Sequence, residues 1–178
     1  MLVSGSMGDH GLTVLARRNS LDLDPALKSD SAALNYMVEA LIAEVGEIHV
    51  LRDPTRGGLA STLNEIAAQS GVDLEIEEAG IPVLESVRAG CSVLGLDPLY
   101  LANEGKLICM LPWEKREEAL TVMARFEEGR LAAVIGRVLG RDASGGEKNR
   151  AGRVVLRTLL GGKRLLSMLE GEQLPRIC

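Results

Sequence analysis

The stretch IHVLRDPTRGGLASTLNEIA, residues 48–67, contains the signals for a strand, a turn and a helix in succession. Its apolar start, 48–51, favours a short strand, and the proline and paired glycines that follow are typical of a tight turn. Leu59, Leu63 and Ile66 then recur at the spacing of one helical face. A strand that passes directly into a helix predicts a layered α/β domain.

The rest of the chain repeats this alternation of helical and extended patterns. Apolar residues at helical spacing predict helices that begin near Leu12 and cover 31–46, 84–94 and 113–128. Apolar runs predict strands over 72–76, 99–102, 107–111, 133–138 and 154–156, and a last ordered element near 165–166. The strands 99–102 and 107–111 are expected to pair as a hairpin. The expected fold class is therefore α/β, with a mixed β-sheet covered by helices.

The composition fits one folded domain with room for a flexible arm. Of 178 residues, 46% are hydrophobic and 25% are charged. The net charge of −5 and the few aromatics, one Trp, two Tyr and one Phe, argue against nucleic-acid binding. The apolar start at 1–3 is too short for a signal peptide, and no run of about 18 apolar residues suggests a membrane span. We expect a cytoplasmic protein.

The three cysteines divide into two kinds. Cys91 falls in an expected helix and Cys109 in an expected strand, where burial would raise the thiol pKa and leave each with a structural role. Cys178 ends the chain behind a polar stretch, so we expect an exposed and mobile thiol. An accidental terminal residue is the alternative. Their wide spacing without a CxxC pair suggests neither a disulfide framework nor a zinc site.

The strand-to-helix junction at 52–58 is a candidate anion site. A helix N-terminus presents free amides and a positive dipole end, and two arginines add charge. A second interpretation is an Asp or Thr cap on a glycine turn, since the spacing is not that of a Walker phosphate loop. The candidate phosphate-facing residues are Arg52, Asp53, Thr55, Arg56, Gly57 and Gly58.

A second glycine-rich loop, SGSMGDHG at 4–11, precedes the first helix and places Asp9 and His10 where they could face a ligand. A turn role for both residues is the alternative. With His49 as the only other histidine, a multi-histidine metal site is not expected.

Glu104 lies in the connection Asn-Glu-Gly of the expected hairpin and could act as a general base. The alternative is a solvated turn acid. The same solvated position is expected for Glu75, Glu77 and Glu78, which alternate with or follow the apolar residues of strand 72–76.

Taken together, GDHG, LRDPTRGGLA with LNEIA, LGLDPLYLANEGKL and the terminal GEQLPRIC closely resemble the hydrogenase maturation proteins of the HypE family. The resemblance covers essentially the whole chain in the same order. It implies the fold of the carboxyl-terminal domain of aminoimidazole ribonucleotide synthetase, a mixed sheet covered by helices with partly ferredoxin-like topology. It also implies a flexible C-terminal tail.

The resemblance implies a defined chemistry for two residues. Cys178 would accept a carbamoyl group from HypF, and ATP-dependent dehydration would convert the thiocarboxamide into a thiocyanate. The cyanide would then pass to the iron of the NiFe hydrogenase cofactor, assembled on a HypC–HypD scaffold. Glu104 looks like the carboxylate that removes the nitrogen protons in that dehydration.

Family members are about twice this long, which implies that an amino-terminal ATP domain with magnesium ligands lies outside this sequence. We therefore expect residues 1–20 to be the remnant of a junction, 21–168 the α/β domain, and 169–178 the tail. ATP and Mg²⁺ belong to the full-length family, which is usually homodimeric, and this chain alone is expected to bind neither and to be inactive. The alternatives are a scaffold-binding module without covalent cargo and a phosphate-ligand domain of the same superfamily.

Overall fold

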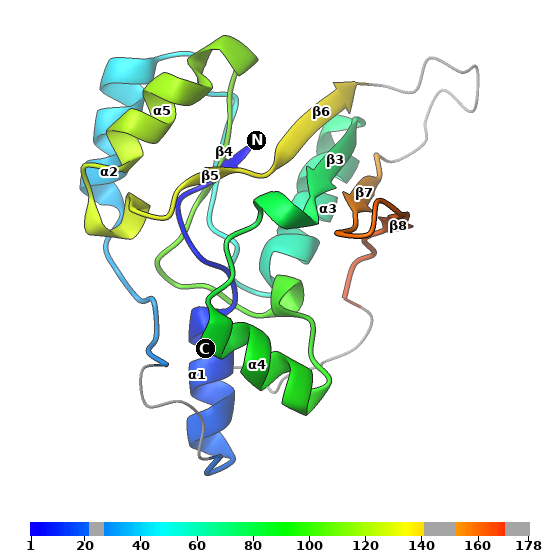
Figure 1. Ribbon diagram of the computed structural model, residues 1–178. Coiled ribbons are helices and arrows are strands. Elements are labelled where there is room, and N and C mark those ends of the chain that lie inside the picture. Colours follow the sequence, from blue (N-terminus) through cyan, green and yellow to red (C-terminus); the bar gives the residue numbers. More distant parts are fainter. Residues whose placement is uncertain (22–26, 141–151, 170–178) are drawn as a thin grey trace.

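The computed structural model describes residues 1–21, 27–140 and 152–169, which form two four-stranded sheets with helices around them (Figure 1). Sheet A is wholly antiparallel, with the order β2-β4-β1-β5. Its strands are β1 (Leu2–Val3), β2 (Val50–Arg52), β4 (Ile108–Met110) and β5 (Ala133–Val134).

Sheet B has the order β6-β3-β7-β8. Its strands are β3 (Asp73–Glu77), β6 (Gly136–Gly140), β7 (Val154–Arg157) and β8 (Lys163–Leu165). β3 and β7 run parallel, whereas β3 with β6 and β7 with β8 are antiparallel. The mixed α/β class predicted from the sequence is therefore confirmed.

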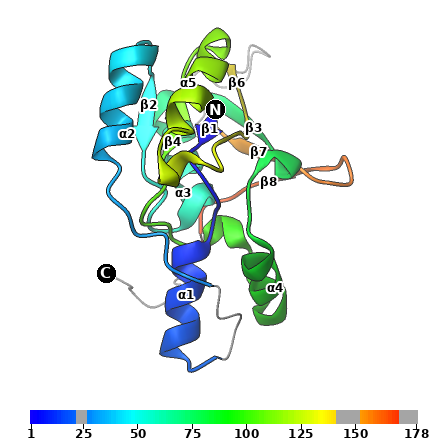
Figure 2. The same ribbon diagram turned by 60° about the vertical axis from the view of Figure 1, so that its left-hand side comes forward.

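The helices fall into three groups. In Figures 1 and 2, α2 and α5 lie side by side beyond sheet A, α1 and α4 form the opposite end, and α3 lies against the sheets. Their bounds are α1 Asp9–Arg18, α2 Asn35–Ala40, α3 Gly58–Ser70, α4 Glu85–Leu94 and α5 Arg116–Met123. A π-helical turn, Leu41–Val45, prolongs α2. Short 3-10 turns cover Glu78–Gly80, Pro98–Tyr100, Trp113–Lys115 and Glu127–Gly129. No helix among the described residues is both long and apolar enough to span a membrane.

The two faces of sheet A build two separate cores, because neighbouring residues of a strand point to opposite faces. Leu2 packs with Met37 and Met123 in the cluster under α2 and α5, whereas Val3 belongs to the cluster of Leu63 on α3. A third cluster joins α1 to α4, and its members include Leu12, Val87, Cys91 and Leu101. The sequence analysis had not predicted β1, the strand from which the first two cores are organised.

The expected hairpin of 99–102 with 107–111 is wrong. Residues 98–100 form a 3-10 turn, in which the Asp97 carboxylate accepts a 2.9 Å hydrogen bond from the Leu99 amide. The second expected strand exists as β4, but it pairs with β1 and β2. Leu99 and Leu101 are apolar because they are buried against the N-terminal end of α3 and in the α1–α4 cluster, not because they pair in a sheet.

Several element boundaries also differ from the prediction. The helix expected over 31–46 begins only at Asn35, and the one expected over 113–128 is an α-helix only over Arg116–Met123. The strand expected over 133–138 is divided at Ile135 into β5 and β6, one in each sheet. The helices α3 and α4 and the strands β3 and β7 lie where the sequence predicts them.

Glu75 is not the solvated acid that the sequence predicts. Its side chain is only 3% exposed, and it accepts hydrogen bonds from Arg137 at 2.9 Å and from Lys163 at 2.6 Å. These two bonds lower the pKa of the Glu75 carboxyl. From β3, the carboxylate thus binds β6 on one side and, beyond β7, β8 on the other. A buried charge is retained only where it is paired.

Candidate functional site

Three segments that the sequence analysis singled out meet around one side chain, the amide of Asn103. We call them the glycine loop (residues 4–11), the arginine loop (52–58) and the Glu104 loop (101–107). Oδ1 of Asn103 accepts from the Gly8 amide at 2.8 Å, and Nδ2 donates to the Pro54 carbonyl at 3.0 Å and the Leu101 carbonyl at 3.1 Å. Asn103 is fully buried, so its amide fixes the relative positions of the three loops.

Two glycines allow the loops to approach this closely. A Cβ on Gly58 would lie 2.5 Å from the Leu101 carbonyl oxygen, and Gly58 has a φ of +60°. On Gly11 a Cβ would lie 2.8 Å from the Ala102 amide nitrogen, and the Gly11 amide donates to the Ala102 carbonyl at 2.9 Å. A side chain at either position would separate main chains that are in direct contact.

Glu104 is held by a buried acid from a distant segment. Its main-chain amide donates to Oδ1 of Asp30 at 3.1 Å, and Nζ of Lys106 lies 3.7 Å from Oδ2 of the same carboxylate. The Asp30 side chain is 2% exposed. A Cβ on Gly105 would lie 1.8 Å from the Asp30 carbonyl oxygen, so this loop closes tightly on Asp30. The Glu104 residue itself is half-buried.

Asp9 is buried at the start of α1 and has an unusual environment. Ser6 Oγ donates to Oδ2 of Asp9, whereas Oδ1 is buried and has no hydrogen-bond partner among the described residues. Burial raises the pKa of the Asp9 carboxyl, against the opposing effects of the Ser6 hydrogen bond and of Lys106. A carboxyl of this kind can hold a proton more readily than an exposed one. His10 lies beside it and has Nδ1 2.8 Å from Ser29 Oγ.

The arginine loop leads into α3 without a side-chain cap. Gly57 is the N-cap, with a φ of 69°, and no side chain of the described residues caps the amides of the first turn. The alternative of an Asp or Thr cap is therefore wrong. Thr55 contributes its carbonyl, which accepts from the Gly58 amide at 3.1 Å. An uncapped helix start can offer its amides to an anion.

The charged residues of the arginine loop all lie near the surface. Arg52 forms a 2.8 Å ion pair with Glu65 on α3, and both side chains are partly exposed. Asp53 and Arg56 are exposed and form no ion pair with another described residue. Asp53 and Arg56 are thus accessible to a ligand, while Arg52 would first have to leave Glu65.

The end of the described chain lies beside the arginine loop. Asn64 on α3 donates to the Leu166 carbonyl at 2.8 Å, and the Tyr100 hydroxyl donates to the Ser167 carbonyl at 2.9 Å. A Cβ on Gly57 would lie 4.0 Å from Cβ of Leu169. Cys178 and the tail 170–178 lie outside the described residues. Nine residues follow Leu169 in the sequence, and a chain of that length can span at most roughly 30 Å.

Cys91 and Cys109 are buried, as predicted, in α4 and β4. Burial raises the pKa of each thiol to about 11. Both are therefore poor nucleophiles in the folded state. Within the ranges 1–21, 27–140 and 152–169, no three His, Cys, Asp or Glu side chains gather as ligands of a metal ion would.

Sequence reasoning had brought Glu104, the glycine loop and the arginine loop forward as separate candidates. It missed Asn103 and Asp30, which hold them together. Asn103 is adjacent to Glu104, and its place between an apolar run and a glycine is the only local signal for it. Asp30 carries no such signal, because its partners Glu104 and Lys106 lie more than 70 residues later in the chain.

Comparisons with known proteins agree with this architecture. The family model of the C-terminal domain of AIR synthase related proteins matches residues 1–148. The carbamoyl dehydratase HypE of Azotobacter vinelandii is 51% identical over 178 residues, which are 100% of this chain and 50% of that protein.

Two solved structures are similar over nearly the same extent. A crystal structure of the hydrogenase maturation protein HypE in complex with ATP has 62% identity and a TM-score of 0.91, covering 99% of this chain and 52% of that one. A crystal structure of a HypE-HypF complex has 40% identity and a TM-score of 0.84, covering 94% and 52%. The chain thus spans about half the length of the relatives that it matches. It belongs to the family of AIR synthase related proteins, as their C-terminal domain, and within that family it is similar to the carboxyl-terminal part of HypE.

Proposed function

We propose that this chain is the carboxyl-terminal part of a carbamoyl dehydratase that serves the maturation of NiFe hydrogenase, with Cys178 as the carrier of the reacting group. One observation carries the proposal. The chain is tied to α3 and Tyr100 at Leu166 and Ser167, and reaches the arginine loop at Leu169. A tail of nine residues anchored there can extend to a partner and fold back over the Glu104 loop.

In the first step, the Cys178 sulfur attacks the carbamoyl carbon that HypF presents. A C–S bond forms, the bond from that carbon to its donor group breaks, and the thiol gives up its proton. The product is a thiocarboxamide on Cys178. The HypE-HypF complex among the similar structures supports HypF as the donor.

In the second step, the amide oxygen of the thiocarboxamide takes a phosphoryl group from ATP and becomes a leaving group. Two protons leave the nitrogen and the C–O bond breaks, so the overall change on the protein is the loss of one water and the product is a thiocyanate. Glu104 is our candidate base for the nitrogen protons. Asp30 and Asn103 fix the loop on which it lies.

ATP and Mg²⁺ are substrate and ion of the full-length protein. The ATP complex of a similar HypE supports the assignment of ATP. The uncapped start of α3, with Gly57, Gly58 and the exposed Arg56, fits one part of a phosphate site. Asp9 and His10 are weaker candidates for the same ligand. We expect the remaining contacts to come from the other half of the protein, so this chain alone should bind ATP weakly or not at all.

The thiocyanate carbon and nitrogen would then pass as cyanide to iron on a HypC–HypD scaffold, and the full-length protein would form a homodimer. A carrier thiol must stay reduced, which fits the cytoplasm. Incubation with HypF, carbamoyl phosphate and ATP should add the mass of one carbamoyl group to the peptide that ends in Cys178. No adduct with active HypF would disprove the proposal.

A Cys178→Ala variant separates cargo transfer from simple binding. We expect this variant to bind HypF but to receive no carbamoyl group and to support no cyanide transfer to the scaffold. If a full-length protein with this substitution supports hydrogenase maturation as well as the unaltered full-length protein does, the domain is a scaffold-binding module without covalent cargo. If ATP binds this chain tightly and independently of Cys178, a phosphate-ligand domain is the better description.

A further inference from the structure

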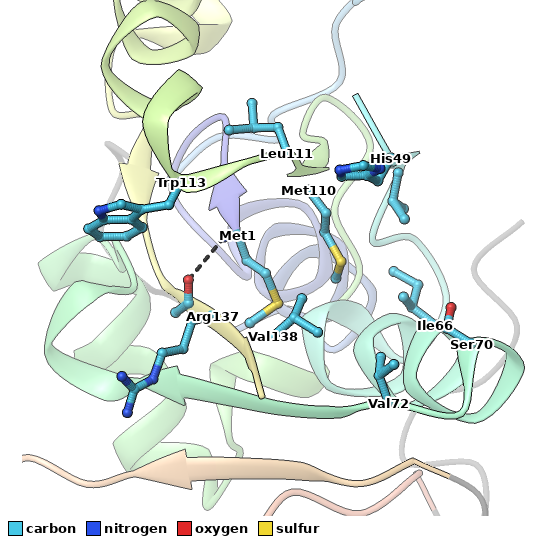
Figure 3. A pocket seen from close by; sticks show the side chains of 12 residues that line it. Met1, His49, Ile66, Ser70, Val72, Met110, Leu111, Trp113, Arg137 and Val138 are labelled. Atoms are coloured by element: carbon cyan, nitrogen blue, oxygen red, sulfur yellow. Dashed lines mark hydrogen bonds between the residues drawn. The ribbon is translucent and has the colours of Figure 1, made fainter. Parts of the chain in front are cut away.

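Four charged side chains meet at a cavity of about 270 Å³ beside α4, which we call the α4 cavity. Residues of α4, of β8 and of the turns before and after α4 line it, and none of them belongs to the three loops. It differs from a cavity of about 460 Å³ that is lined by Met110, Trp113 and Val138 among others (Figure 3). There the guanidinium of Arg137 already pairs with Glu75.

Two of the four charges in the α4 cavity neutralise each other. Nη2 of Arg164 donates to Oδ2 of Asp97 at 2.9 Å. The other oxygen of Asp97, Oδ1, accepts from the Leu99 amide at 2.9 Å. A ligand would have to break one of these bonds to bind either side chain. Arg164 and Asp97 are therefore part of the cavity wall.

The other two charges, those of Arg88 and Glu78, have no counter-ion among the described residues. The exposed guanidinium of Arg88 forms neither a hydrogen bond nor an ion pair there. Oε2 of Glu78 accepts from the Leu159 amide at 2.9 Å, and this neutral donor leaves the negative charge uncompensated. Ser92 lies one helical turn after Arg88 and also lines the cavity, so its hydroxyl is a second donor near the guanidinium.

The rest of the lining is mainly apolar. Ile81, Val83 and Leu96 contribute aliphatic side chains. Burial raises the pKa of the Cys91 thiol to about 11, so this lining residue is uncharged at neutral pH. At roughly 30 Å³ per water molecule, the cavity of about 270 Å³ equals the volume of about nine waters. It therefore has room for a small metabolite with one aliphatic group.

We propose that the α4 cavity binds a free α-amino acid with a branched aliphatic side chain, such as leucine. Arg88 and Ser92 would hold its carboxylate, and Glu78 would hold its ammonium group. A guanidinium binds a carboxylate through two parallel hydrogen bonds, and Ser92 adds a third donor. Ile81, Val83 and Leu96 would contact the side chain.

Charge balance favours this class of ligand over others. The lining carries two positive and two negative groups, and a zwitterion brings a counter-ion to each of the two that lack one. A simple carboxylic acid would leave Glu78 without a counter-ion, and a simple amine would leave Arg88 without one. This proposal concerns a second site and goes beyond the proposed function.

The first test is calorimetric titration of the 178-residue chain with L-leucine, with circular dichroism to confirm that the chain is folded. We expect saturable binding with a dissociation constant of about 1 mM or tighter. Isocaproate lacks the amino group, isoamylamine lacks the carboxylate, and glycine lacks the aliphatic side chain. Each should bind at least about tenfold more weakly than leucine. No saturable binding of leucine by the folded chain, or equal binding of isocaproate, overturns the proposal.

The second test removes each charge from the cavity. Arg88→Gln and Glu78→Gln should each weaken leucine binding at least about tenfold. Both should fold, because Arg88 is exposed and a glutamine at 78 keeps an oxygen for the Leu159 amide. Glu85→Gln is the matched control, since Glu85 is exposed on α4 but does not line the cavity, and its affinity for leucine should be unchanged.

Unchanged affinity in Arg88→Gln or in Glu78→Gln would overturn the proposal, because the ligand would then lie elsewhere or in another orientation. Backbone NMR spectra recorded during the titration should show the largest shifts at Arg88 and Ser92, whose amides lie on the helix that forms the site. None of these measurements involves Cys178, HypF or ATP. Failure of this proposal and failure of the proposed function are therefore distinguishable.

Discussion

The main-chain amide of Glu104 donates a 3.1 Å hydrogen bond to Oδ1 of Asp30, a residue 74 positions earlier in the chain. Asp30 is itself paired with Lys106, so one buried carboxylate binds both neighbours of Gly105. The position of the proposed base thus depends on a residue that does not touch the reacting group.

An Asp30→Ala variant should therefore slow the dehydration step more than the carbamoyl transfer. We expect about a tenfold or greater loss in thiocyanate formation, since small displacements of a base are costly. Carbamoylation by HypF should change less than twofold, because Cys178 performs it. Single-turnover mass spectrometry on a full-length protein measures both steps. Asp30→Asn, which keeps an acceptor for the Glu104 amide, should restore part of the rate; equal losses in both steps would contradict this role.

Gly58→Ala should destabilise the domain by about 2–4 kcal/mol. A methyl group would meet two carbonyl oxygens, those of Leu101 and Leu99, at 2.5 and 2.6 Å, and the φ of +60° is itself unfavourable for alanine. Gly95→Ala is a matched control. Gly95, the C-cap of α4, also has a positive φ, 67°, in the left-handed helical region, but nothing lies within 4 Å of its Cβ position, so only about 1–2 kcal/mol should be lost. Urea unfolding measures both; equal losses would show that the close contact is not decisive.

Asn103→Ala should cost about 2–4 kcal/mol in the free energy of unfolding, because it leaves buried main-chain groups of three loops without partners. Thermal unfolding should show a melting temperature lower by roughly 5–15 °C. In Asn19→Ala an exposed hydrogen bond to the Leu15 carbonyl is lost instead, and water can replace it. A loss below about 0.5 kcal/mol is expected there. Similar values for the two variants would argue against Asn103 as the link between the loops.

Asp9→Asn should change the pH dependence of stability in one direction. Burial raises the pKa of Asp9 in the folded state above the usual 3.8. The stability linked to its protonated form is therefore complete below pH 3.8 and declines as the pH rises through the folded-state pKa. Asparagine does not titrate. Relative to the unaltered chain, the free energy of unfolding of the variant should therefore rise between pH 4 and pH 7, as measured by chemical unfolding. A difference between the two free energies that does not change with pH would show that the pKa of Asp9 is not raised.

Alkylation should distinguish the three thiols. At pH 8 a thiol of pKa about 11, such as Cys91 or Cys109, is only about 0.1% ionised, whereas an ordinary cysteine is about one-quarter ionised. Iodoacetamide should modify Cys178 at least a hundredfold faster than the other two in the folded chain. Peptide mass spectrometry measures each site. In denaturant all three should react at similar rates, which controls for local sequence.

The parts of the fold that the sequence predicts are those fixed by local pattern. The helix α3 follows from its apolar spacing and ends at Gly71, whose φ of 63° suits a glycine. The predicted hairpin is wrong because Leu99 and Leu101 are buried outside any sheet, and a buried turn needs apolar residues just as a strand does. The Asp97–Pro98 pair starts the 3-10 turn, and such a pair in the sequence is typical of a turn and not of a strand.

The parts that the sequence does not predict depend on distant partners. The local sequence predicts a surface acid at Glu75, because its partners Arg137 and Lys163 lie 62 and 88 residues later in the chain. The same holds for Asn103, whose partners Gly8 and Pro54 lie 95 and 49 residues away. For the candidate site, local sequence patterns thus identify the loops that form it, but not the buried side chains that hold these loops together.

The central place of β1 in sheet A has a consequence for folding during synthesis. Its neighbours β4 and β5 come more than 100 residues later, so a nascent chain on the ribosome has to wait for both before the sheet can close. Until then Leu2 and Val3 lack their partner strands. They would form an exposed apolar segment to which chaperones could bind.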